Sequence, residues 1–285
     1  MMGRRTISKS VSAAGIALHA GSTVHMTLMP GATGAGIVFR RTDLGDREVI
    51  ARYDHVRGTQ LGTVIGDDRG ATVGVVEHLM AALAGAEIDD VLVSVDGPEP
   101  PILDGDASSY LRMIDEAGVT ESAVPRRVIR VLKQISVERG DARATLSPSV
   151  TRIFDFEIVF PSAVIGTQRF TWEFSPEGFR RDIAPARTFG FTHELDALLR
   201  SGLGRGASLE NTLAIQDDCV VNGALMRYPD EFVRHKILDA LGDLALAGAP
   251  IVGRFEGRRS GHALNNALLH ALFSDSSNYE EVSLA

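Results

Sequence analysis

Hydrophobic and polar residues alternate strictly in several short stretches of the chain. The apolar members are Val24, Met26 and Leu28 in the first half, and Phe154, Phe156, Ile158 and Phe160, then Phe170, Trp172 and Phe174, in the second. Successive side chains of a strand point to opposite faces, so this pattern predicts strands with one buried face.

Other segments carry apolar residues at helical spacing. TVGVVEHLMAALAG predicts a helix that ends at Gly85, VLVSVDG a strand, EPPILDGD a loop and SSYLRMIDEAG a short helix. Residues 230–247 predict the strongest helix, because Pro229, Asp230 and Glu231 suit its positive N-terminal end, and Gly248 and Pro250 stop it. A loop-rich region is expected over residues 184–222.

The polar, proline-containing stretch VTESAVPRR at residues 119–127 marks a domain boundary, which predicts two lobes at residues 1–124 and 125–285. VEHLMAALAG precedes a strand ending VDG, and RHKILDALGDLALAG precedes PIVGRFEG, so the halves resemble distant copies. Chance similarity stays open, since the order helix, glycine, strand is common. Strands followed by helices in each half predict α+β lobes with a site between them.

Composition narrows the class of protein. The 285 residues carry a formal net charge of −8, which disfavours a nucleic-acid binder. Cys219 is the one cysteine, so an intrachain disulfide is excluded and a cytoplasmic location is expected. The N-terminus is a poor signal peptide, and no apolar run approaches the roughly 18 residues of a membrane span.

The helix at 230–247 also carries polar residues on one face. His235, Asp239 and Asp243 are spaced by four residues, so their side chains form a stripe. A histidine and an aspartate one turn apart can hold a single metal ion. The alternative is a solvated helix face with a weak pair between His235 and Asp239, and the helix alone favours that alternative.

Glu77 and His78 change the balance, because they interrupt an otherwise apolar segment. Buried acids and imidazoles need partners. One interpretation is a histidine bonded to backbone beside an exposed glutamate. The functional interpretation makes His78 a third metal ligand and Glu77 a general base, which gives the open three-ligand arrangement of catalytic zinc.

The segment RRSGHALNNALLHALF predicts a helix that starts at Ser260 or Gly261, with His262 in its first turn. An incidental histidine beside a helix cap is one interpretation. The other is a protonated acid or electrostatic stabiliser, which needs an acidic partner such as Asp243, because a helix N-terminus alone lowers the pKa of a histidine. Arg259 adds positive charge at the same end.

The chain resembles the zinc-dependent UDP-3-O-acyl-N-acetylglucosamine deacetylases of lipid A synthesis. The motifs that carry the resemblance are GIALHAG, GIVFRR, VVEHLMAALAG, PILDGDA, ARTFGF, DEFVRHKILDALGDLALAG and SGHALNN, in this order along nearly the whole chain. It implies an α+β, two-lobed sandwich, each lobe a mainly antiparallel sheet packed on helices, with the active site between the lobes. It also implies hydrolysis of the N-acetyl amide of a UDP-acyl-sugar, the committed step of that pathway, by a cytoplasmic, usually monomeric enzyme without a membrane span.

The resemblance also implies roles for individual residues. The metal ligands fall on His78, His235 and Asp239, and the ion is Zn²⁺ or, given this donor set, Fe²⁺. The catalytic residues fall on Glu77 as base, His262 oriented by Asp243, and Thr188 and Lys236 at the carbonyl or oxyanion. The substrate-binding residues fall on Phe189, Leu195, Arg259, Ala207 and His19, although His19 could equally be a turn residue. A basic rim for the diphosphate is expected from Arg259, Lys236 and either Lys133 or Arg143.

The sequence departs from the family pattern at four places. Arg259 replaces the usual lysine, Ala207 a glycine and Asp90 an asparagine, and Gly62 stands where relatives often carry a larger residue. Two other functions compete with the deacetylase. A decayed relative that binds a UDP-sugar without catalysis would not need Glu77 or His262. A serine hydrolase that pairs Ser260 with His262 lacks a nucleophile-elbow pattern.

Overall fold

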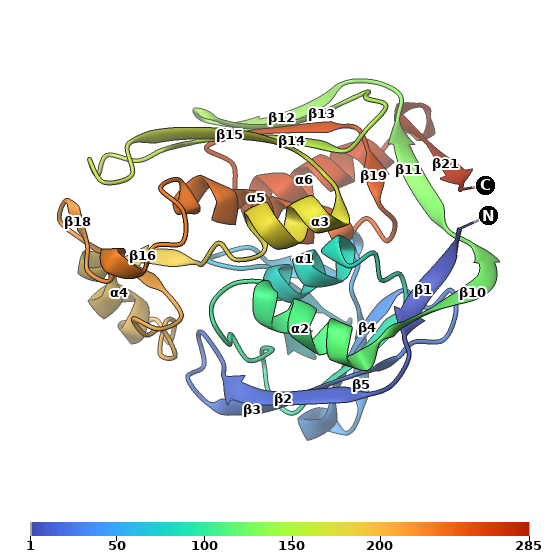
Figure 1. The fold of residues 1–285 in the computed structure, drawn as a ribbon, viewed down its shortest axis with the longest axis horizontal. Coiled ribbons are helices and arrows are strands. Elements are labelled where there is room, and N and C mark those ends of the chain that lie inside the picture. The colour runs from blue at the N-terminus through green and yellow to red at the C-terminus, as the bar shows by residue number, and fades with distance from the viewer. Residues whose placement is uncertain (1, 285) are drawn as a thin grey trace.

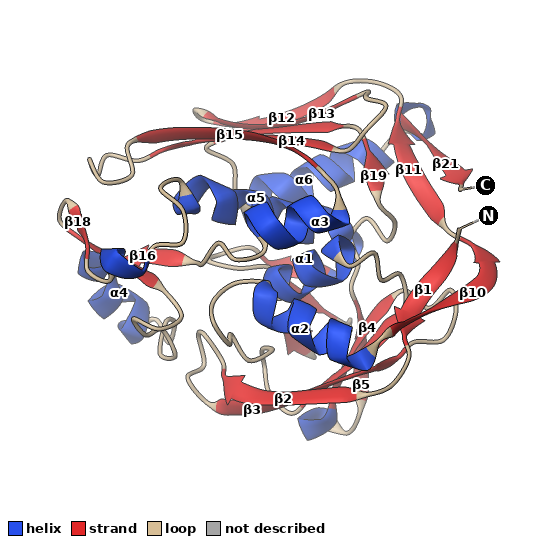
Figure 2. Cartoon of the chain, in the orientation of Figure 1, coloured by secondary structure: helices blue, strands red, loops and turns tan. Residues whose placement is uncertain are grey.

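Two five-stranded sheets enclose a layer of helices. The computed structural model describes residues 2–284. One sheet lies at the bottom of Figure 1 and the other at the top, and the main helices fill the space between them, as the colouring in Figure 2 shows. The chain is therefore an α+β sandwich, and the expected fold class is confirmed.

The two large sheets share one topology. The first has the order β2-β3-β9-β4-β5 and the second β12-β13-β20-β14-β15. In each sheet the third and fourth strands in this order, β9 with β4 and β20 with β14, are parallel, and all other pairs are antiparallel. The bounds are β2 Val11–Ile16, β3 Thr23–Pro30, β4 Ile37–Arg41, β5 Arg47–Ile50, β9 Val91–Val95, β12 Ile135–Arg139, β13 Ala142–Ser147, β14 Ile153–Val159, β15 Thr167–Glu173 and β20 Arg254–Arg258.

Each large sheet is also accompanied by a corresponding pair of helices. α1 (Glu77–Gly85) precedes β9 and α2 (Ser108–Ala117) follows it, while α5 (Glu231–Ala245) precedes β20 and α6 (His262–Phe273) follows it. The weak internal repeat of the sequence thus corresponds to a repeated arrangement of strands and helices. The division at residues 124 and 125 stays a prediction.

The predicted alternation holds in β14, where Phe154, Phe156 and Ile158 are buried. Phe156 lies opposite Gly257 of β20, and a Cβ there would lie 2.7 Å from the phenyl ring. The aromatic face of β14 therefore requires a residue without a side chain on the neighbouring strand.

α1 and α5 cross at very close range in the centre of the molecule. A Cβ on Gly242 of α5 would lie 2.0 Å from the carbonyl oxygen of Glu77 in α1. Eight of the nine α1 residues are buried, so this helix is covered on nearly every side. None of the helices within residues 2–284 has the length and apolar character needed to cross a bilayer.

One expectation from the sequence needs correction, and two segments contain elements that the sequence did not predict. The helix expected from Thr72 begins at Glu77, because Val75 has a positive φ of 51° that breaks the helix. Thr72–Val73 instead forms strand β8, in a small sheet with β6 (Val56–Gly58) and β7 (Val64–Gly66). The polar stretch after α2 contains strand β10 (Val119–Pro125), paired with β1 (Gly3–Ile7). Residues 184–222 contain the sheet β16 (Phe189–Phe191), β17 (Leu213–Gln216) and β18 (Cys219–Val220) and helix α4 (Leu195–Arg200).

The remaining elements are short or close the edge of the molecule. α3 (Pro176–Gly178) leads into a π-helical turn, and β11 (Arg127–Val131) pairs with β19 (Ile251–Val252) and β21 (Tyr279–Ser283). The backbone of Arg126 bonds to Met2 on one side and to Leu284 on the other, which brings both ends of the chain together.

Candidate active site

Two imidazoles and one carboxylate converge where α1 meets α5. The Nε2 atoms of His78 and His235 lie 3.5 Å and 3.3 Å from Asp239 Oδ1. All three side chains are buried, and the solvated helix face considered for His235 and Asp239 is excluded. The structure thus brings together the three residues expected to bind a metal.

These donor atoms fit a small divalent cation. A tetrahedral zinc site with bonds of about 2.0–2.1 Å has ligand-to-ligand edges of about 3.4 Å. Asp239 Oδ1 is buried and has no hydrogen-bond partner among the described residues, although a buried carboxylate oxygen is costly to leave unpaired. A cation between the three atoms would satisfy it.

A backbone carbonyl orients His235. Its Nδ1 lies 3.0 Å from Ala186 O, so Nδ1 donates and Nε2 keeps its lone pair for a metal. Burial lowers the pKa of His235 to about 4, which keeps the ring neutral. Burial by itself would raise the pKa of Asp239, but the neighbouring nitrogen groups, with Lys236 as the cation among them at neutral pH, hold that pKa well below its usual range.

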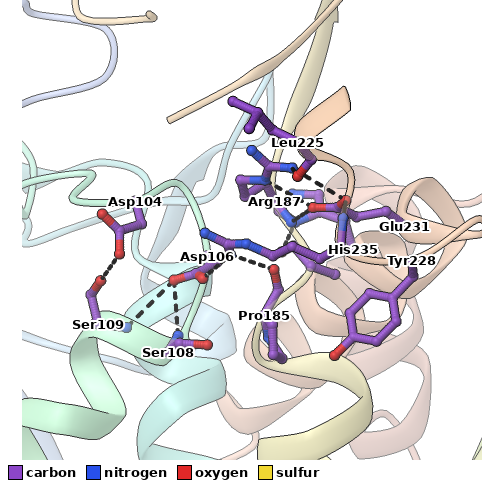
Figure 3. Close-up of polar contacts among 12 residues, drawn as sticks. Asp104, Asp106, Ser108, Ser109, Pro185, Arg187, Leu225, Tyr228, Glu231 and His235 are labelled. Carbon is purple, nitrogen blue, oxygen red and sulfur yellow. Dashed lines mark hydrogen bonds and ion pairs between the residues drawn. The ribbon is translucent and has the colours of Figure 1, made fainter. Parts of the chain in front are cut away.

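A buried ion pair and a partly exposed one hold the segment that carries Ala186, because Arg187 belongs to that segment and Arg227 also donates to Pro185 O (Figure 3). Arg187 donates to Glu231 through its backbone N–H and its side chain, and Glu231 is fully buried. Arg227 pairs with Asp106, which also accepts the backbone N–H of Ser108 at the start of α2. The segment is therefore fixed to α5 and to the loop before α2.

Glu77 is the first residue of α1 and lies beside the metal ligands. Its Oε2 accepts the backbone N–H of Thr63 at 2.9 Å, and its Oε1 is 3.9 Å from His262 Nε2. Burial raises the pKa of Glu77, and the charges of His262 and His78 oppose that rise. A Cβ on Gly62 would lie 3.1 Å from Oε1, so the absence of a side chain at this position leaves room beside the carboxylate.

His262 is the first residue of α6 and pairs with Asp243. Its Nδ1 donates to Asp243 Oδ2 at 2.9 Å. Burial disfavours the imidazolium, but Asp243 and then Glu77 outweigh it and raise the pKa of His262 to about 9. The acidic partner that the sequence analysis required for a protonated histidine is in contact with it.

Lys236 and Phe189 lie next to the metal ligands. Lys236 Nζ is 2.6 Å from Asp239 Oδ2, and this carboxylate contributes most to the raised pKa of Lys236, against the effect of burial. The ring of Phe189 lies edge-on to His235, with 6.3 Å between ring centroids. Thr188 directly precedes Phe189 and bonds through its backbone to Gly105 and Leu213.

The other expected substrate residues are spread more widely. Leu195 begins α4 and Ala207 lies in the following loop, both exposed. His19 bridges two loops, because its Nε2 contacts Leu61 O and its Nδ1 accepts the N–H of Gly204. Arg259 forms a 3.4 Å ion pair with Asp141 on the surface.

The expected basic rim is not a set of free cations. Arg259 and Lys236 are each paired with an aspartate. Lys133 donates to Ser277, and Arg143 lies 3.4 Å from Glu138. Each cation already has an acceptor within the chain.

Residues that the sequence analysis did not single out complete the site. Asn265 donates to Asp243 Oδ2 and accepts from Ser260, so the Ser260 hydroxyl bonds to Asn265 and not to His262. This geometry weighs against a serine nucleophile. Thr63 and Ala186 also contact site residues, and no local spacing reveals them because their partners lie 14 to 180 residues away.

Comparison with known proteins identifies the family. The family model of the UDP-3-O-acyl N-acetylglycosamine deacetylases (LpxC) matches residues 4–274. A deacetylase of this name from Phenylobacterium zucineum is 46% identical over 273 residues, which cover 95% of this chain and 93% of that protein. Those from Myxococcus xanthus and Campylobacter fetus are 45% and 43% identical, over 98% and 99% of this chain and 89% and 96% of theirs. The chain therefore belongs to the UDP-3-O-acyl N-acetylglycosamine deacetylase family.

Proposed function

We propose that this chain hydrolyses the N-acetyl amide of UDP-3-O-(3-hydroxyacyl)-N-acetylglucosamine, releasing acetate and UDP-3-O-acyl-glucosamine for lipid A synthesis. The observation that carries the proposal is the buried group of His78, His235 and Asp239, with a carboxylate and an imidazolium beside it. Membership of the family supplies the substrate class.

His78, His235 and Asp239 would hold the metal ion. A divalent cation in this position supplies Lewis acidity, which lowers the pKa of a water molecule and polarises an amide carbonyl. Two imidazoles and one carboxylate suit Zn²⁺, which is the ion we propose, with Fe²⁺ as the alternative.

Glu77 acts as the general base. Thr63 binds its Oε2, so Oε1 is the oxygen free to take a proton from the attacking water. Burial raises the pKa of Glu77, which brings its basicity closer to that of a proton acceptor working near neutral pH. Formation of the new C–O bond then leaves negative charge on the former carbonyl oxygen.

His262, Lys236 and Thr188 stabilise that oxyanion. The pKa of about 9 keeps His262 protonated at neutral pH, because Asp243 holds the charge on its Nδ1 side. His262 Nε2 lies near Glu77, and either group can protonate the amine as the C–N bond breaks. Lys236, the residue after His235, donates to Asp239 Oδ2, the oxygen that does not face the two histidines.

Further parts of the proposal concern binding and context. Phe189, Leu195, Ala207, His19 and Arg259 contact the sugar, the acyl chain or the diphosphate. Arg259 would exchange Asp141 for a phosphate, since its ion pair is exposed and screened by solvent. We also propose that the protein is a cytoplasmic monomer.

Acetate release from the UDP-linked substrate tests the function. Glu77→Gln should lower kcat by at least about 100-fold and leave one bound metal ion per chain, because a base is removed and no ligand is changed. Glu48→Gln, in an exposed pair with Arg40, is the control and should keep full activity. Binding of the substrate by the unmodified protein without acetate release would instead support the non-catalytic alternative.

A further inference from the structure

A single buried threonine connects the two halves of the proposed acid–base pair. Thr63 lies in the loop before β7 and is only 1% exposed. Its backbone N–H donates to Glu77 Oε2 at 2.9 Å, and its hydroxyl donates to Asp243 Oδ1 at 2.6 Å. Its carbonyl oxygen accepts the N–H of Val76, the residue before α1. Every polar group of this residue is thus committed to the site.

The hydroxyl completes the set of donors around Asp243. Asp243 Oδ2 accepts from His262 Nδ1 and Asn265 Nδ2, and Oδ1 accepts from Thr63. Donors on both oxygens fix the plane of the carboxylate, and that plane sets the direction in which His262 Nε2 points. A hydroxyl that donates to a carboxylate forms a stronger hydrogen bond than one that donates to an uncharged acceptor, and the bond from Thr63 to Asp243 is of this kind.

The backbone N–H acts on the other partner. It binds one oxygen of Glu77 and leaves Oε1 directed toward His262, 3.9 Å away. Thr63 therefore fixes the base and, through Asp243, the acid from one rigid point. The catalytic groups come from two helices of different halves, α1 and α6; Thr63 contacts Glu77 of α1 directly and contacts Asp243, which orients His262 of α6.

We propose that Thr63 is a positioning residue that sets the relative orientation of Glu77 and His262 through its hydroxyl and its backbone amide. The inference rests on the proposed roles of Glu77, Asp243 and His262. Among the described residues its side-chain hydroxyl bonds to Asp243 and not to a metal ligand, so we expect the hydroxyl to act on turnover and not on metal or substrate binding.

Thr63→Val tests this because valine keeps the shape and the backbone amide and removes the hydroxyl. Loss of a hydrogen bond to a charged acceptor predicts a fall in kcat of about 10- to 100-fold. KM and metal content should stay within about twofold of the unmodified enzyme. Thr63→Ser restores the hydroxyl and should recover most of kcat. Thr42→Val, which removes a hydroxyl bonded to Val95 O in the first sheet, is the matched control and should have no effect.

A double-mutant cycle separates positioning from a general loss of packing. If the hydroxyl acts through Asp243, Thr63→Val should cost less than about twofold in kcat in an Asp243→Ala background, because its acceptor is already gone. Additive losses, or a Thr63→Ser variant as impaired as Thr63→Val, would overturn the proposal. Full activity of Thr63→Val beside inactive Glu77→Gln and Asp243→Ala would also overturn it and leave the proposed function intact. Full activity of all three would refute the proposed roles of Glu77 and Asp243, whereas an unmodified protein that releases no acetate would refute the proposed function itself.

Discussion

The close crossing of α1 and α5 makes Gly242 a sensitive position outside the site itself. In Gly242→Ala the new Cβ would lie 2.0 Å from Glu77 O. Carbon and carbonyl oxygen approach no closer than about 3.3 Å, so the first turn of α1 must move away from α5 by about 1.3 Å. That turn carries Glu77 and His78, whereas His235 and Asp239 stay on α5.

A shift of this size is large for a metal site. Ligand distances are defined to about 0.2 Å, and a displacement of about 1 Å in an active site can cost about 100-fold in rate. We therefore expect Gly242→Ala to weaken metal binding at least about 10-fold and to lower kcat/KM about 100-fold. Overpacking should also reduce the free energy of unfolding by about 1–3 kcal/mol.

Competition with a chelator measures the metal affinity, and acetate release at saturating zinc measures turnover. Gly58→Ala is the control, because its Cβ would meet Val64 at an ordinary distance of 3.4 Å. Wild-type metal affinity and turnover in a folded Gly242→Ala protein would refute the argument that the helix crossing sets the ligand geometry.

Three further predictions concern charge and metal. Asp243 raises the pKa of His262, so Asp243→Asn should lower that pKa. Because the protonated form of His262 is lost as pH rises through its pKa, the alkaline limb of the kcat/KM profile should move to lower pH. An alkaline limb that does not move would contradict the assignment of His262. Arg187→Met leaves Glu231 buried without its main partner and should reduce the free energy of unfolding by about 3–5 kcal/mol in urea titrations, whereas a loss under 1 kcal/mol would show that the pair is unimportant. Zinc at 100 times its Kd should stabilise the folded protein by about 2.7 kcal/mol in thermal unfolding, and His235→Ala should remove that stabilisation. Equal stabilisation of the unmodified protein and of His235→Ala would place the ion elsewhere.

Local patterns in the sequence predicted much of the secondary structure. Two-residue alternation marks β14 and β15, and the boundary residues Pro229 and Gly248 bracket α5 within a few positions. Where the local hydrophobic pattern did not predict the observed element, contacts with distant parts of the chain determine it. The helix expected from Thr72 is broken at Val75, and β10 is a strand because β1 lies beside it, 112 or more residues earlier.

The site divides in the same way. His235, Asp239 and Asp243 lie four residues apart on one helix, so their shared face follows from helical geometry alone. The orientation of their side chains does not, since it depends on Ala186 O, Lys236 and Asn265. The carbonyl of Ala186 reaches the site because ion pairs of Arg187 and Arg227 hold its segment, and such contacts leave no periodic trace in a single sequence.

One divalent cation is expected between a ligand from α1, His78, and two from α5, His235 and Asp239. Anomalous diffraction at the zinc edge from crystals of the active, zinc-loaded protein tests it directly. We expect a single strong peak about 2.0–2.1 Å from the Nε2 atoms of His78 and His235 and within about 2.2 Å of Asp239 Oδ1. A peak on any other set of residues, or an active protein without a peak between α1 and α5, would contradict it.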